Sequence, residues 1–308
     1  MQSALGTGIA NTESKTKRKW HPFDIANSLL MIFLAVLTIF PFYYMVIISL
    51  ADYADIRSQL IYLIPKSLNF SSYKIVLETN YFLNSFYISF IVTVVGTLVS
   101  MFVTITAAYA LSKRNIPGWK TIYTAAIIPL FFSGGLIPYY LTVKATGMIN
   151  DISVMIIPTA LAPFYLIILK NFFDDLPESL EESAKIDGAN DIYILYKIVL
   201  PISTPAIATI TLFYAVDHWN DYYSAVLFIS DQKLYPLQTV LREVLMNFEM
   251  LKGSVVGAAI MEQNRTSYVY TQSLKMAIVV VATVPILLVY PFVQKYFNKG
   301  IMLGAVKE

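Results

Sequence analysis

The amino-acid sequence predicts an all-α membrane protein with six transmembrane helices. Two observations carry this prediction: an excess of apolar residues, and six apolar runs of membrane-spanning length. Of 308 residues, 57% are hydrophobic and 14% are charged, whereas soluble proteins have about 25% charged and roughly 45–50% apolar residues. A core of this size cannot absorb that excess of apolar side chains, so lipid must be a second solvent. The composition therefore argues against a soluble enzyme.

Charge and cysteine content narrow the functional classes further. The formal net charge is only +2, without the clustered basic face that nucleic-acid binding needs, so we expect no nucleic-acid partner. The chain has no cysteine, which excludes disulfides, thiolate metal ligands and a cysteine nucleophile. With two histidines in the whole chain, a metal site has little support, and none is expected.

Six segments can cross the roughly 30 Å hydrocarbon layer of a bilayer, which takes a helix of about 20 residues. They span residues 26–48, 86–111, 120–141, 152–173, 203–229 and 274–296. Residues 1–24 are polar, and no short apolar segment with a cleavage site precedes the first span, so that span is predicted to be an uncleaved anchor. Residues 25–298 then form one membrane domain, and residues 299–308 form a tail.

Positive charges orient these spans, because cytoplasmic connections carry an excess of lysine and arginine. The segment before span one, the connection between spans two and three, and the segment after span six are basic. Their basic residues are Lys15, Lys17, Arg18, Lys19, Lys113, Arg114, Lys120, Lys295, Lys299 and Lys307. The opposite orientation would place the basic residues of segment 230–273 inside, but long connections cross membranes with little regard to charge. Both termini are therefore predicted to be cytoplasmic.

Span two carries a stripe of small and hydroxylated residues at intervals of three or four. The stripe consists of Ser85, Ser89, Thr93, Thr97, Ser100, Thr104 and Ala108. This spacing places them on one helical face, where small side chains let a neighbouring helix approach closely. Helix packing is the preferred interpretation, and a water-exposed pore wall is the alternative.

The connection between spans four and five is predicted to fold as a capped helix hairpin. Asp175 can cap a helix that has Pro177 in its first turn and Glu178 at the reciprocal capping position. Gly188 suits the left-handed residue that ends such a helix.

A second short helix is expected directly after this turn. Asn190 or Asp191 can cap its start, and Pro201 limits it before span five. The hairpin is thus a rigid, ordered element. A membrane protein that holds such a helix at its cytoplasmic face usually offers it to a partner.

The hairpin sequence resembles the EAA loop of ATP-binding-cassette importer permeases. The family pattern is Glu-Ala-Ala, three residues, Gly, nine residues, Ile, one residue and Leu-Pro. With Ser in place of the first Ala, every spacing is kept by Glu182, Ser183, Ala184, Gly188, Ile198, Leu200 and Pro201. The six-span layout, Trp219-Asn220-Asp221 and the end of the chain are similar to carbohydrate permeases of the maltose-importer type. This resemblance implies the type I importer permease fold.

In that family the loop forms a coupling helix, which docks in a cleft of the ATPase subunit. Carried over by position, Glu182 and Gly188 are the docking and hinge residues. The contact would be lined by Ser183, Ala184, Asp187 and Ala189. The family's C-terminal tail also reaches toward the ATPase pair, which gives a second, weaker contact at Lys299, Gly300 and Gly304.

The chain has no Gly-Lys dipeptide, so the phosphate-binding loop Gly-x-x-x-x-Gly-Lys-Ser/Thr is absent. It is therefore expected to be a non-catalytic subunit that binds no cofactor itself, with ATP and Mg held by a partner ATPase. The resemblance implies an ATPase dimer, a second permease subunit and an extracytoplasmic solute-binding protein. These would assemble in the bacterial cytoplasmic (inner) membrane.

Span five carries polar side chains, which are costly within a membrane and normally face a cavity or a partner. The candidates for a carbohydrate path are Tyr214, Asp217, Trp219, Asn220, Asp221 and Tyr222. Carboxylates and amides can bond sugar hydroxyls, while an aromatic ring can cover a sugar face. A polar clamp to the partner permease is the alternative for these residues.

The segment 230–273 is predicted to lie outside and to contain an amphipathic helix. Its apolar face consists of Leu237, Val240, Leu241, Val244 and Leu245. In maltose-type permeases the corresponding loop contacts the binding protein.

The predicted function is ATP-driven import of a carbohydrate, such as an oligosaccharide, by alternating access. One alternative is the same architecture for a non-sugar solute. The other is an autonomous secondary transporter, which would need internal repeats with paired broken helices. The sequence contains no visible repeat of that kind.

Overall fold

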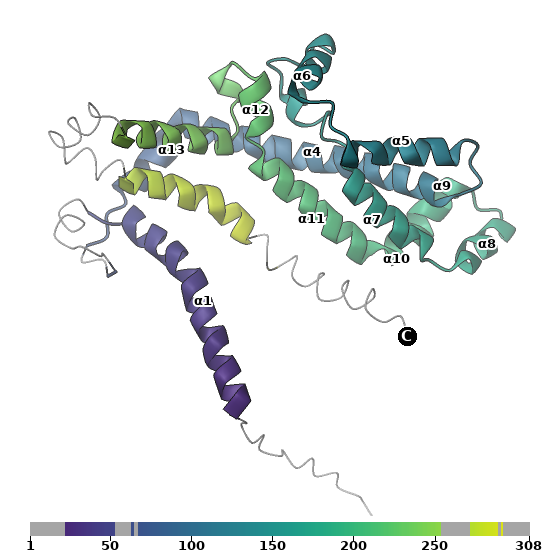
Figure 1. Ribbon diagram of the computed structural model, residues 1–308, viewed down its shortest axis with the longest axis horizontal. Coiled ribbons are helices and arrows are strands. Elements are labelled where there is room, and N and C mark those ends of the chain that lie inside the picture. The colour runs from purple at the N-terminus through teal and green to yellow at the C-terminus, as the bar shows by residue number, and fades with distance from the viewer. Residues whose placement is uncertain (1–21, 53–62, 65–66, 254–271, 289–290, 292–308) are drawn as a thin grey trace, which may run out of the picture. The chain divides into compact units, whose positions relative to one another are not determined.

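The computed structural model describes residues 22–52, 63–64, 67–253, 272–288 and 291. The chain divides into two compact units, residues 1–44 and 45–308. The regular secondary structure of the described residues is helical (Figure 1), as the sequence predicts.

Helix α1, Pro22–Ser49, has 28 residues, or about 42 Å at 1.5 Å per residue, and so exceeds the thickness of the hydrocarbon layer. Most of it lies in the first unit, where apolar side chains such as Leu29 and Phe33 are exposed. These side chains need an apolar environment, which agrees with the predicted first span. The last residues of α1, Ile47 to Ser49, are buried in the second unit.

Helix α4, Asn80–Ser112, is the central helix of the second unit. Its most extensive packing is against α11 (Thr204–Asn220) and α7 (Pro163–Asp174) (Figure 1). Most of its small and hydroxylated stripe is buried, at Ser85, Ser89, Thr97, Ser100, Thr104 and Ala108. The packing interpretation of the stripe is therefore confirmed, and the pore-wall interpretation is wrong for these residues.

The segment 120–141, expected to be a single span, is divided between two helices. α5, Trp119–Phe131, and α6, Leu136–Ala145, are separated by residues 132–135. Gly135, directly before α6, has a φ of +85°, a non-helical conformation that glycine adopts at little steric cost. Hydropathy does not reveal such a break, because apolar residues flank it on both sides.

The segment 152–173 also forms less helix than expected. A short 3₁₀ turn, η1 (Ile152–Met155), is followed by irregular backbone, and α7 begins only at Pro163. Proline has no N–H to extend a helix but fits its first turn. Pro158 and Pro163 therefore account for the late start of this helix.

The segment 203–229 breaks near its end. α11 stops at Asn220, and a separate short helix, α12 (Tyr223–Phe228), follows. The backbone at Asp221 is extended, and its Oδ1 accepts the N–H of Ser224 at 3.1 Å. Such a local side-chain bond favours a turn over continuation of the helix.

Two helical segments form the predicted hairpin between α7 and α11. The first is α8, Glu178–Ile186. The second is a continuous run of α9 (Asp191–Ile194), a π-helical turn η2 (Leu195–Val199) and α10 (Leu200–Ile202). This run meets α11 at an angle of 86°. The run ends at Ile202, one residue after Pro201, and the bend lies at the next residue, Ser203, close to the limit that this proline was predicted to set.

The helix Gln272–Leu288 covers the described part of the predicted sixth span. Its Ala277 and Ile278 pack with Val76 of α3 (Ser71–Glu78), and its Ala282 packs with Trp219. The expected amphipathic helix of segment 230–273 is α13, Leu237–Gly253, whose Leu237 packs in the cluster of Trp219 and Ala282.

Two helices among the described residues, α1 and α4, are each long and apolar enough to span a membrane. The bent pair Asp191–Ile202 and Thr204–Asn220 would form a third span if taken together. The count of six spans stays a prediction.

A substitution at Gly96 tests the packing of α4 on α11. A Cβ at this position would lie 2.8–2.9 Å from three atoms of the His218 ring. We expect Gly96→Ala to lower the free energy of unfolding by about 1–3 kcal/mol, as overpacked cores do, measured as a lower thermal midpoint in detergent. Gly134→Ala is the control, since nothing lies within 4 Å of its Cβ position. Equal midpoints for the two variants would contradict the packing.

Candidate functional site

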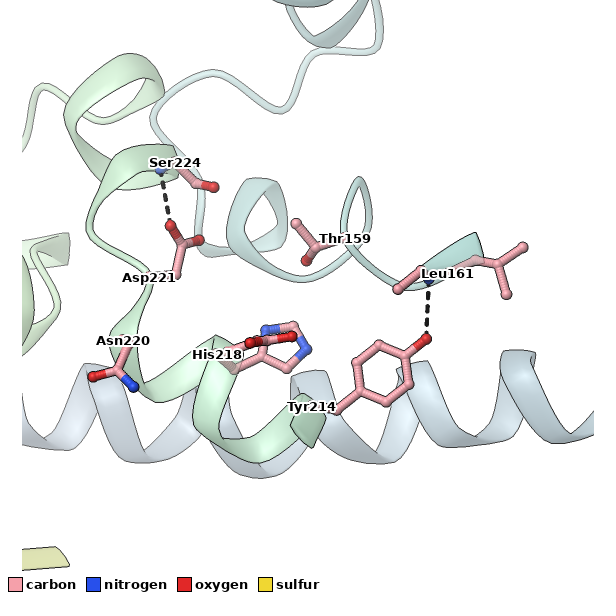
Figure 2. A pocket seen from close by; sticks show the side chains of 9 residues that line it. Thr159, Leu161, Tyr214, His218, Asn220, Asp221 and Ser224 are labelled. Carbon is pink, nitrogen blue, oxygen red and sulfur yellow. Dashed lines mark hydrogen bonds between the residues drawn. The ribbon is translucent and has the colours of Figure 1, made fainter. Parts of the chain in front are cut away.

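A cavity of about 410 Å³ lies where α11 ends, beside the irregular segment that precedes α7 and the start of α12. Its lining residues are Thr159, Leu161, Ala162, Tyr214, Asp217, His218, Asn220, Asp221 and Ser224. Figure 2 shows these side chains between the end of α11 and the segment that carries Thr159 and Leu161. The irregular segment before α7 and the break at the end of α11 therefore form the walls of this cavity. Irregular backbone at membrane depth is tolerated where it lines such a cavity.

Tyr214 joins three parts of the second unit. Its side chain is buried, its hydroxyl makes a 2.7 Å hydrogen bond with Thr104 Oγ1 of α4, and the N–H of Ala162 donates to it at 3.0 Å. Figure 2 shows this last bond closing one side of the cavity. The hydroxyl thus fixes the start of α7 to α4 and α11, which makes Tyr214 a wall of the cavity and a structural link.

Asp217 is the exposed carboxylate of the site. Its Oδ2 accepts the hydroxyl proton of Tyr165 at 2.7 Å. The Tyr165 ring is held in turn by stacking on Phe213, at 5.6 Å between centroids, and by an edge contact with Tyr214 at 4.8 Å. The carboxylate is therefore oriented by an aromatic support while its second oxygen remains available to a ligand.

Asn220 and Asp221 occupy the point where α11 ends. Asn220 Nδ2 donates to the carbonyl of Val216 at 2.9 Å, and its Oδ1 accepts from Gln238 at 3.4 Å. Asp221 Oδ1 caps Ser224, while its Oδ2 is buried without a hydrogen-bond partner among the described residues. A buried acceptor left unpaired is costly, so this oxygen is suited to a donor supplied from outside the chain.

His218 was not among the predicted path residues, yet it lines the cavity. Its side chain is buried, its Nε2 lies 3.2 Å from Ser100 Oγ, and its ring covers Gly96. The signal that could have revealed it is the helical spacing of Gly96 and Ser100, four residues apart on α4, which leaves room for one ring on the facing helix.

Of the six path candidates, the cavity brings together Tyr214, Asp217, Asn220 and Asp221, whereas Trp219 and Tyr222 do not line it. Trp219 is buried on another face of α11, where its Nε1 donates to the carbonyl of Ala282 at 3.2 Å. Tyr222 lies beyond the end of α11, and the guanidinium of Arg242 sits 4.2 Å from its ring centre. Successive helical residues are rotated by about 100°, so neighbours in sequence separate into different environments.

The second candidate region is α8 and the turn after it. Gly188 has the predicted positive φ, +84°. The N–H of Gly188 donates to the carbonyl of Lys185, and that of Ala189 donates to Ala184. This pair of bonds is the Schellman arrangement that ends helices at a left-handed glycine.

Both helix starts in the hairpin can be compared with prediction. Asn190 caps α9 by accepting the N–H of Tyr193 at 2.8 Å, as expected. The expected cap by Asp175 on α8 is wrong: Asp175 ends α7, with its N–H bonded to the carbonyl of Asn171, and Pro177 precedes α8. α7 runs further than predicted and therefore takes the residue assigned to the cap.

The coupling candidates separate into exposed and half-buried residues. Exposed positions are Glu182, Ser183, Asp187 and Gly188. Ala184 and Ala189 instead pack against this chain's own hydrophobic cluster. The largest apolar side chain of the exposed turn is Ile186, which is 87% exposed. The tail candidates Lys299, Gly300 and Gly304 lie outside the described residues.

A protein-family model matches nearly the whole chain. The family is described as "Binding-protein-dependent transport system inner membrane component", and the match covers residues 20–303.

Two relatives of similar length come from Bacillus subtilis (strain 168). The chain is 42% identical over 285 residues to the polygalacturonan/rhamnogalacturonan transport system permease protein YtcP, covering 92% of this chain and 98% of that one. It is 43% identical over 287 residues to Protein LplC, covering 92% and 95%.

A solved structure has a similar fold. It is the crystal structure of a bacterial ABC transporter involved in the import of the acidic polysaccharide alginate. The TM-score is 0.80 with 32% sequence identity, and the alignment covers 89% of this chain and 96% of that one. The family match over residues 20–303 includes both candidate regions.

The hydroxyl of Tyr214 offers a test of how the cavity is held. Tyr214→Phe leaves Thr104 and the N–H of Ala162 without their partner, so we expect a loss of about 1–3 kcal/mol in stability. Thermal unfolding in detergent measures this loss. Tyr223→Phe is the matched control, because Tyr223 is exposed and should change the midpoint little. Equal effects of the two substitutions would contradict the linking role.

Proposed function

Since the chain belongs to the family of inner membrane components of binding-protein-dependent transport systems, we propose that it is a permease subunit of an ATP-binding-cassette importer that moves an oligosaccharide into a bacterial cell. One structural observation supports this role above others. The first residues of the EAA pattern, Glu182 to Ala184, lie in a separate helix, α8, which exposes Ile186 at its end and is followed by the left-handed Gly188.

The exposed turn is suited to docking on a partner subunit. Ile186 is 87% and Ile192 is 69% exposed, on either side of Gly188. Exposed apolar side chains next to carboxylates such as Glu182 are typical of an interface with an apolar centre and a polar rim. We assign this surface to the ATPase, which would hold ATP and Mg and carry out hydrolysis.

The complete transporter then needs further parts. They are a second permease subunit, an ATPase dimer and an extracytoplasmic binding protein that delivers the saccharide. In this arrangement the chain crosses the cytoplasmic membrane six times with both termini in the cytoplasm. An autonomous secondary transporter receives no support from a family whose members depend on a binding protein.

The substrate class is proposed from the relatives and from the cavity. The name of YtcP refers to polygalacturonan and rhamnogalacturonan, and the related solved transporter imports alginate. The side chains of Asp217, Asn220 and Asp221 line the cavity with hydrogen-bond acceptors, and Tyr214 forms part of its wall. Such a set matches the many hydroxyl donors of a saccharide, and we assign the remaining wall to the second permease subunit.

The docking role of α8 predicts the effect of a single substitution. Ile186→Ser should weaken co-purification of the ATPase and lower binding-protein-dependent sugar uptake at least about tenfold, because exposed apolar side chains at an interface centre carry much of its affinity. Leu68→Ser is the control: Leu68 is also an exposed apolar residue, at 60%, but lies outside the hairpin. Normal uptake by the Ile186 variant would remove the support for this docking surface.

The cavity role predicts a different result for Asp217. Asp217→Ala should reduce sugar uptake severalfold, the loss expected for a charged hydrogen-bonding partner, while the ATPase still co-purifies. Trp219→Ala should instead impair assembly, because Trp219 is buried between helices. Transport by Asp217→Ala at the wild-type rate would mean that the cavity is not on the sugar path.

A further inference from the structure

Helix α8 is held in place without a hydrophobic anchor of its own. None of its residues, Glu178–Ile186, is fully buried. Its apolar support is the half-buried Ala184, and Leu176 in the link before it. Two such shallow contacts do not fix the orientation of a helix of nine residues. Its polar contacts must therefore contribute.

One ion pair ties α8 to the end of α4. Lys113 is the residue at which α4 ends, and its Nζ donates to both carboxylate oxygens of Glu181 in α8. The two side chains are only 27% and 17% exposed. The ammonium also lies 4.8 Å from the ring centre of Tyr109, one turn earlier in α4. The Lys113 ammonium thus contacts an aromatic ring of α4 and forms an ion pair with α8.

A second group of charges stands beside this pair at the end of α7. Asp174 accepts from Lys170 at 2.5 Å, and Arg114 approaches the same carboxylate at 3.6 Å. Lys170 is 6% exposed and lies over the rings of Trp119 and Tyr123 in α5. A polar cavity of about 450 Å³ is lined by residues of both groups, from α8 and from the ends of α4 and α7.

The ion pairs of these two groups differ in how much each is expected to contribute to holding α8 in place. Arg114 is 75% exposed at 3.6 Å from its partner, so solvent screening leaves it a minor part. Removing one partner of the shielded Lys113–Glu181 pair would leave a carboxylate without compensation in a partly dehydrated place, which is far more costly. Lys113–Glu181 is the contact that can decide the position of α8.

We propose that Lys113 and Glu181 form an ionic clasp that makes α8 and α4 move as one body. Lys113 is then a positioning residue for transport. A displacement of α8 by the ATPase would pass through the clasp into α4, and from α4 through Ser100, Thr104 and their partners on α11 to the cavity. This inference rests on the proposed function, since it assumes that α8 receives the ATPase.

Charge reversal separates coupling from simple stability. The complete transporter is reconstituted in vesicles, and the number of sugar molecules imported per ATP hydrolysed is measured for Lys113→Glu, for Glu181→Lys and for the two combined. We expect each single reversal to lower this ratio at least about threefold, since each places two like charges together. The combined variant restores the opposite charges and should recover at least about half of the wild-type ratio.

The control is the exposed pair Lys74–Glu78 in α3, whose side chains are 72% and 66% exposed. Reversing either of its charges should leave the ratio within about twofold of wild type, as exposed pairs contribute little. If a reversal at the clasp prevents assembly, Glu181→Gln is measured in the same way, because it removes the charge and keeps the shape. The same threefold fall is expected.

Two results would overturn the clasp. One is a wild-type ratio in the single variants, and the other is a combined variant that assembles but recovers nothing. In either case, the proposed function is unaffected if the wild-type complex imports sugar and this import depends on the binding protein. A wild-type complex without such import overturns the proposed function itself, so the two failures are distinguishable.

Discussion

The close approach of α4 and α11 is the constraint on which the rest of the second unit depends. Gly96 leaves room for the His218 ring, and Ser100 and Thr104 bond the polar side chains of the facing helix. A larger residue at position 96 would push the helices apart. Because membrane helices gain little from apolar burial against one another, small residues and hydrogen bonds must hold such a contact together. The α4–α11 contact also sets the walls of the cavity.

Helix α4 contacts both candidate regions, one along its middle and one at its end. Its middle holds Tyr214 and His218 beside the cavity, and its end carries Lys113 against α8. A continuous helix of 33 residues is a stiff element, so a displacement of one end also displaces the other end. The irregular backbone before Pro163 and at Asp221 lines the cavity, where a ligand can approach.

The sequence predicts some features well and others poorly, for physical reasons. The spacing of small residues on α4, the left-handed Gly188 and the cap at Asn190 follow from local rules, and all are present. The breaks within predicted spans were missed, because hydropathy sums over a window and does not sense the backbone. Trp219 and Tyr222 were grouped with the cavity residues although only the helix rotation and its end at Asn220 decide where they point.

If α8 carries the contact with the ATPase, a cross-linker on its exposed turn should reach that subunit. The chain has no cysteine, so Asp187→Cys gives a single thiol at the exposed turn beside Ile186, to which a photoactivatable cross-linker can be attached in the assembled transporter. After illumination, the cross-linked partner is identified by mass. The account predicts that this partner is the ATPase subunit. Cross-linking to the extracytoplasmic binding protein, or to no protein at all, would contradict it.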